Sequence, residues 1–142
     1  MPTRHANAVW EGGIREGKGS FSAESGAIGG EYSFGTRFGD AKGSNPEELL
    51  AASHAACFSM ALSGALERAG KPATRIETAA ACTVEKVGEA FAVTSMKLTV
   101  RATVPGISDA DFQGAAAGAR DNCPISKVMK GNVSVDLEAS LT

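Results

Sequence analysis

The feature that most constrains the fold of this chain is a helical stretch over residues 46–69 whose faces are nearly all small or apolar. Asn45 followed by Pro46 is typical of a helix start, because Asn caps the first backbone N–H groups and Pro suits the first helical position. Glu48 is expected to complete a capping box with Asn45, and Gly70 ends the helix. A helix that is apolar all round is normally buried. Because the chain has only 142 residues, we expect a second subunit to cover part of this helix.

The N-terminal region before this helix is rich in glycine and alternates weakly between apolar and polar residues. This pattern predicts three short strands over residues 4–10, 19–24 and 31–38. Glycine pairs at 12–13 and 29–30 are expected to form the turns between them. We therefore interpret the region as a three-stranded meander.

The part of the chain after the helix is expected to contain a hairpin, a second helix and a last strand. Alternating apolar residues over 76–84 and 92–104 predict the hairpin, with one of its faces exposed to water. The remaining elements are expected to be a helix over residues 109–122, a short helical turn up to residue 130 and a strand over residues 133–141. The resulting order, βββ-α-ββ-α-β, belongs to the α+β class.

Composition and charge exclude several classes of partner. The formal net charge is −2, so neither nucleic acid nor an anionic membrane is expected to bind. The N-terminus has no apolar run of the kind a signal peptide needs, and no stretch is expected to span a membrane. We therefore expect a cytoplasmic protein with a single domain over residues 1–142.

The chain has three cysteines, Cys57, Cys82 and Cys123, and none forms a C-x-x-C pair. An odd count argues against a secreted disulfide framework. His5 and His54 are too few and too scattered for a zinc site, and no metal or other cofactor is expected. Disulfides that form between cysteines in the cytosol are usually transient and catalytic. An inert buried cysteine is, however, just as common as a catalytic one. The cysteines are therefore candidates for thiol chemistry.

The three cysteines stand in different local settings. Cys57 lies in the middle of the long helix, where the helix dipole gives little help, so a basic side chain or hydrogen-bond donors would have to lower its pKa. Cys123 ends the second helix just before Pro124, at a junction that can move and so allow a resolving thiol to approach its partner. Cys82 shares the parity of the apolar positions in its strand, and we interpret it as a core residue.

Three other side chains are candidates for a role beside Cys57. Arg37 is expected at the end of the third strand, where its guanidinium would hold a thiolate and bind a peroxide oxygen if the fold directs it at Cys57. Glu48 would fix that guanidinium through a charge-assisted pair, in addition to capping the helix. His54 lies one turn before Cys57 and would be its base in a Cys–His pair, although a histidine at a packing contact is the more common case.

Several motifs together resemble the OsmC/Ohr family of peroxidases. Residues 45–62 are similar to the central helix of that family, and residues 122–126 to its second cysteine motif. Residues 36–38 resemble its strand-end arginine motif, and residues 10–12 its opening segment. The match covers essentially the whole chain, and the sequence around the helical cysteine is closer to the OsmC branch than to the Ohr branch.

The resemblance implies an intertwined α+β homodimer with active sites at the subunit interface and without metal or flavin. It implies the reduction of organic hydroperoxides, and more weakly of hydrogen peroxide, in stress defence, with an external dithiol as the reductant. By the same resemblance, Cys57 is the peroxidatic thiol and Cys123 the resolving thiol, while Arg37 activates Cys57 and Glu48 orients Arg37.

Two other functions stay open at this point. A cysteine-dependent acyl transferase or thioesterase would use Cys57 as its nucleophile and His54 as its base, and would have no need of Cys123. A non-catalytic dimeric binding domain would have an ordinary thiol pKa at Cys57 and would consume no peroxide. The contacts of these three residues therefore separate the alternatives.

Overall fold

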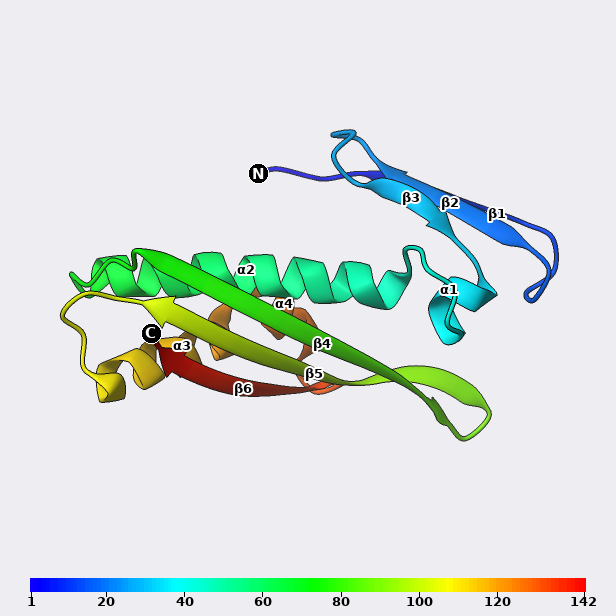
Figure 1. Ribbon diagram of the computed structural model, residues 1–142. Helices are drawn as coiled ribbons and strands as arrows, with labels where there is room; N and C mark the ends of the chain where they lie inside the picture. Colours follow the sequence, from blue (N-terminus) through cyan, green and yellow to red (C-terminus); the bar gives the residue numbers. More distant parts are fainter. The chain divides into compact units, whose positions relative to one another are not determined.

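The computed structural model describes residues 1–142, which divide into two compact units, Met1–Leu49 and Leu50–Thr142. Each unit contains one three-stranded sheet, so the fold is of the α+β class (Figure 1). Helix α2 begins at the end of the first unit and supplies the long helix of the second. The two units are described in turn.

The first unit is an antiparallel sheet followed by a short helix. Three aromatic rings gather on this sheet, with ring centroids 5.6 Å apart for Trp10 and Tyr32 and 6.1 Å apart for Phe21 and Tyr32. Even so, the only buried residues of the unit are Gly19 and Glu47. The elements are β1 (Ala6–Glu11), β2 (Lys18–Ala23), β3 (Gly29–Tyr32) and α1 (Phe34–Phe38), and the strands pair in chain order.

The prediction of a strand over residues 31–38 is wrong for the residues that follow β3, because a capping box at Ser33 starts helix α1. The Ser33 side chain accepts a hydrogen bond from the Thr36 backbone N–H at 3.2 Å, and the Thr36 side chain accepts one from the Ser33 backbone N–H at 2.9 Å. Arg37 therefore lies in a short helix and not at a strand end.

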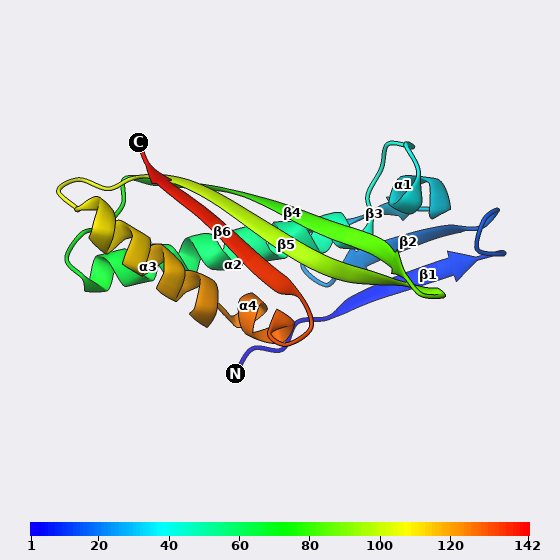
Figure 2. The same cartoon turned by 90° about the horizontal axis from the view of Figure 1, so that it is seen from below.

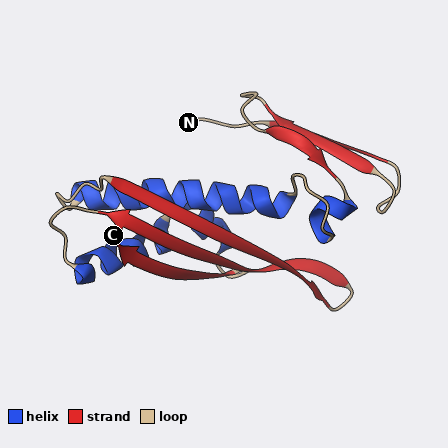
Figure 3. Ribbon diagram, in the orientation of Figure 1, coloured by secondary structure: helices blue, strands red, loops and turns tan.

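The second unit is a mixed sheet in the order β4-β5-β6, with its helices packed on one face (Figures 2 and 3). Strands β4 and β5 form an antiparallel hairpin, whose turn contains Gly88 at a φ of 63°. Strands β5 and β6 are parallel, so the chain must cross over between them, and α3 and α4 form that crossover. The elements are α2 (Pro46–Arg68), β4 (Arg75–Val87), β5 (Ala90–Thr103), α3 (Asp109–Asn122), α4 (Pro124–Met129) and β6 (Ser134–Leu141).

The core of the second unit lies between the sheet and its helices. The opposite face of the sheet is polar, and Lys97 and Glu138 form an ion pair of 3.3 Å there. The alternation of strands β4 and β5, with one face exposed to water, is therefore confirmed. The core residues without exposed surface include Phe58, Leu62, Leu66, Met96, Leu98, Val100, Phe112 and Ala116.

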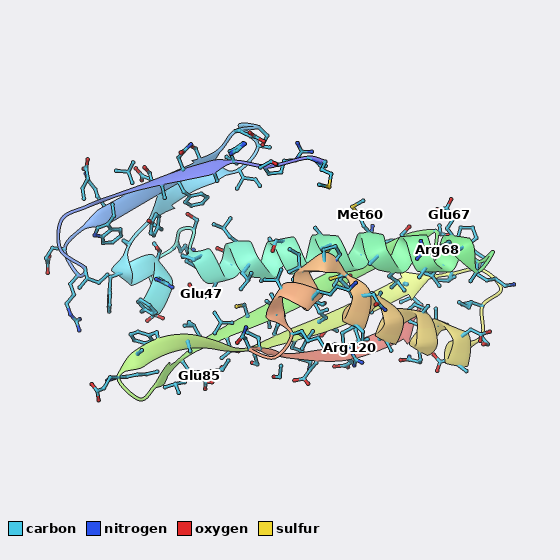
Figure 4. All side chains as sticks on the ribbon, turned by 180° about the vertical axis from the view of Figure 1, so that it is seen from behind. Glu47, Met60, Glu67, Arg68, Glu85 and Arg120 are labelled. Carbon is cyan, nitrogen blue, oxygen red and sulfur yellow. The ribbon has the colours of Figure 1, made fainter.

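Helix α2 is long and apolar enough to cross a membrane by length and composition alone, contrary to the expectation from the sequence. A core helix passes the same test, and Phe58 and Leu66 of α2 are packed in the core of the second unit. The other face of α2 is not covered in the single chain: Met60 is 78% exposed and points away from the sheet (Figure 4). Burial of α2 on every side is therefore not achieved within one chain.

Candidate functional site

The centre of the candidate site is a pair of free thiols, Cys57 and Cys123, which lie close enough for their side chains to interact. Cys57 lies in the middle of α2 and is partly buried, next to the fully buried Phe58. Cys123 lies between two helices, as the C-cap of α3 and the N-cap of α4, and has no exposed surface. Two thiols far apart in the sequence are thus brought together by the packing of α4 near the middle of α2.

The surroundings of Cys57 within the second unit disfavour its thiolate. Burial raises the pKa of the Cys57 thiol above its ordinary value, and the contact with Cys123 raises that pKa further. A hydrogen bond from the backbone of Ile125 lowers the pKa, but by less than burial raises it. A reactive Cys57 therefore needs an additional positive charge.

The surroundings of Cys123 are dominated by Ser126, one helical turn further along α4. The Ser126 backbone N–H donates to the Cys123 sulfur at 3.3 Å, and the Ser126 hydroxyl oxygen lies 3.2 Å from the same sulfur. That hydroxyl is also 2.7 Å from Nε2 of His54 on α2. His54, Ser126 and Cys123 therefore form a continuous buried chain of polar groups.

The Cys57–His54 pair considered from the sequence does not form. Nε2 of His54 is directed at Ser126, and Nδ1 is buried without a hydrogen-bond partner. Burial lowers the pKa of His54 below its ordinary value, which favours the neutral ring. The imidazole thus reaches towards Cys123 through Ser126 and is not placed as the base of Cys57.

Arg37 is held by Glu47 and not by Glu48, which corrects the pairing expected from the sequence. The Arg37 Nε donates to the two Glu47 carboxylate oxygens at 3.0 and 3.2 Å, and Nη2 donates to Oε1 at 2.8 Å. Such a two-pronged pair fixes the plane of the guanidinium. Glu48 is exposed, and its backbone N–H donates to the Asn45 side chain at 2.8 Å. Glu48 therefore belongs to the helix cap.

Arg37 also borders a small aromatic cavity of the first unit, with a volume of about 230 Å³. The guanidinium lies over the ring of Phe38, at 4.9 Å from the ring centroid. A cation at the edge of an apolar cavity is suited to a ligand with one polar and one apolar end. The lining residues are Trp10, Ile14, Tyr32, Ser33, Phe34, Arg37 and Phe38.

Two of the residues described above were missed or left without a role in the sequence analysis. Glu47 stands beside the predicted Glu48, and its low exposure of 7% is visible only in the structure. Ser126 lies within the second cysteine motif, but its contact with His54 spans 72 positions, so no local pattern could reveal it. Cys82 lies on β4 opposite Met96, in agreement with its parity as a strand residue.

Comparison with known proteins gives consistent matches. Residues 39–138 match the OsmC-like protein family. The chain is 45% identical over 136 residues to the peroxiredoxin OsmC of Escherichia coli (strain K12), a match that covers 95% of each protein. It is 30% identical over 138 residues to an organic hydroperoxide resistance protein of Xanthomonas axonopodis pv. citri, covering 95% of this chain and 92% of the relative.

Solved structures show the same similarity in three dimensions. The crystal structure of an organic hydroperoxide resistance protein from Elizabethkingia anophelis matches with a TM-score of 0.81 and 26% sequence identity. That match covers 100% of this chain and 98% of the other. The similarity to known proteins therefore extends over both units.

Proposed function

Because the chain belongs to the OsmC-like protein family, we propose that it is a thiol peroxidase that reduces organic hydroperoxides and, more weakly, hydrogen peroxide. The observation that carries this proposal is the contact between the side chains of Cys57 and Cys123. Thiols so placed are suited to a cycle of oxidation and disulfide formation. The names of the relatives, a peroxiredoxin and hydroperoxide resistance proteins, support the same reaction class.

The proposed cycle has three steps. The Cys57 thiolate attacks one peroxide oxygen, the O–O bond breaks, and the alkoxide that leaves takes up a proton as alcohol. Cys57 is thereby oxidised to a sulfenic acid. The Cys123 sulfur then attacks the Cys57 sulfur, the S–O bond breaks, and water leaves as the disulfide forms. An external dithiol reduces the disulfide by exchange and restores both thiols.

Arg37 is proposed to supply the positive charge that Cys57 needs. A guanidinium keeps its charge at any working pH, so it favours a thiolate and stabilises charge on the departing oxygen. Glu47 fixes the orientation of Arg37 through their two-pronged pair. The aromatic cavity beside Arg37 would then receive the organic group of the hydroperoxide.

A homodimer is proposed as the working form. The first unit buries only Gly19 and Glu47, and a three-stranded sheet with so little core is not stable on its own. Met60 on α2 and Val9 on β1 are exposed by 78% and 56%. A second copy would cover these apolar surfaces and so complete one domain over residues 1–142. We place this dimer in the cytoplasm, where reducing systems regenerate thiols.

Three cysteine substitutions test the proposed cycle. Cys57→Ser is expected to abolish peroxide turnover, because the attacking sulfur is lost. Cys123→Ser is expected to react once and then stop as a sulfenic acid that is prone to further oxidation. Cys82→Ser is the matched control and is expected to keep full turnover, because Cys82 lies on β4 with the parity of the strand's core-facing residues.

The measurement is peroxide consumption together with mass spectrometry after one equivalent of hydroperoxide. A disulfide between Cys57 and Cys82, or undiminished turnover in Cys123→Ser, would contradict the proposal. Full activity of Cys123→Ser on an acyl ester, without peroxide consumption by the parent, would instead favour the acyl transferase. That alternative is less well supported, because His54 is bonded to Ser126 and not to Cys57.

A further inference from the structure

Two members of the polar chain from His54 to Cys123, namely His54 and Ser126, have no part in the cycle proposed above, although all three members are buried. Cys123 and His54 have no exposed surface and Ser126 is 5% exposed. Polar groups are costly to bury unless they are hydrogen-bonded. His54 is buried and its Nδ1 has no hydrogen-bond partner, so its presence in the core needs an explanation.

The proton positions in this chain follow from the contacts. A neutral imidazole carries one N–H. If that proton were on Nδ1 of His54, a buried donor would have no acceptor, whereas a proton on Nε2 is donated to Ser126 Oγ at 2.7 Å. Buried N–H groups without an acceptor are rare. Ser126 Oγ then accepts from His54, and this leaves its own hydroxyl proton free to be donated to the Cys123 sulfur at 3.2 Å.

The Cys123 sulfur accepts a hydrogen bond from the Ser126 N–H at 3.3 Å, and with this proton arrangement it accepts a second one from the Ser126 O–H at 3.2 Å. A thiolate is a much better acceptor than a thiol, so both bonds become stronger when Cys123 loses its proton. They also fix the direction of the sulfur. That sulfur lies close enough to Cys57 for the two side chains to interact.

We infer that Ser126 and His54 are positioning residues for the disulfide-forming step: Ser126 stabilises and aims the Cys123 sulfur, and His54 orients the Ser126 hydroxyl. This inference rests on the proposed peroxidase cycle. In the step concerned, the S–S bond forms, the Cys57 S–O bond breaks, and the Cys123 proton leaves with the departing hydroxide as water. The Cys57 sulfur is reduced and the Cys123 sulfur is oxidised, so no further oxidant is needed.

Other charged groups near the chain belong to the cleft that Ser126 borders. Arg120, Asp121 and Lys130 line that cleft, and Arg120 is bonded to Asp121 at 2.9 Å. These residues are exposed or partly exposed, so solvent screens them. The disulfide-forming step is therefore expected to depend on His54 and Ser126 more than on these charged side chains.

The test measures sulfenic acid formation at Cys57 and disulfide formation with Cys123 separately, by stopped-flow single turnover of the full chain. Samples quenched with a nucleophile that is specific for sulfenic acids are then analysed by mass spectrometry. Ser126→Ala is expected to leave sulfenic acid formation at Cys57 unchanged. The substitution is expected to slow disulfide formation by about tenfold to a hundredfold, because this is the typical effect of losing one hydrogen bond to a charged group. Because the sulfenic acid at Cys57 then persists, sulfinic acid should accumulate at excess peroxide.

Two substitutions of His54 give the matched comparison. His54→Gln keeps an N–H that can reach Ser126 and is expected to retain most of the disulfide-forming rate, whereas His54→Leu is expected to behave like Ser126→Ala. The inference is overturned if Ser126→Ala forms the disulfide as fast as the parent, if it slows both steps equally, or if the two His54 variants do not differ. Failure of the peroxidase proposal itself would look different, because the parent chain would then form no sulfenic acid with peroxide.

Discussion

Glu47 and Glu48 are neighbours with the same charge at the start of α2, but it is Glu47 that is held against Arg37. Their difference comes from the helix cap. Asn45 binds the backbone N–H of Glu48 at 2.8 Å, and this fixes the first turn so that Glu47 faces α1 while Glu48 faces solvent. A difference of one position along the helix therefore decides which of the two carboxylates orients the Arg37 guanidinium.

This pair provides a matched test at the residue scale. Glu47→Gln is expected to slow sulfenic acid formation at Cys57 by on the order of tenfold, because Arg37 loses a charged partner that fixes its direction. Glu48→Gln removes the same charge from the same helix end, so both variants lose a similar favourable interaction with the helix dipole. Stopped-flow oxidation and denaturant unfolding are compared for both. Equal oxidation rates in the two variants would mean that Arg37 is not oriented through Glu47.

At the scale of elements, the helices and strands predicted correctly are those with a clear periodicity of apolar residues. Helix α2 and the long strands β4 and β5 appear where the spacing of apolar residues placed them, because burial on one face imposes that spacing. Helix α1 was missed because its five residues are too few to show a period and depend on the Ser33 cap. The parallel pairing of β5 with β6 and the contact of His54 with Ser126 join distant segments, so no local pattern contains them.

Strand β5 offers a test of which face supports the fold. Leu98→Ala is expected to lower the free energy of unfolding by about 2–5 kcal/mol, because a buried side chain is replaced by a cavity. Lys97→Ala, one position earlier, is expected to cost less than about 1 kcal/mol, since its ion pair with Glu138 is exposed. Denaturant unfolding at one protein concentration measures both. Similar losses for the two variants would contradict the assignment of core and solvent faces.

At the scale of the whole molecule, the uncovered surfaces of one chain predict that folding and association are coupled. Sedimentation at micromolar concentration is expected to show a dimer. Its apparent free energy of unfolding should rise by about 1.4 kcal/mol per dimer for each tenfold increase in concentration, as mass action requires. Met60→Lys places a charge on the exposed apolar face of α2 and is expected to weaken the dimer. Ser140→Lys places the same charge on the polar face of β6 and should not. A folded monomer whose stability does not depend on concentration would rule out the dimer, and with it a site completed by a second copy.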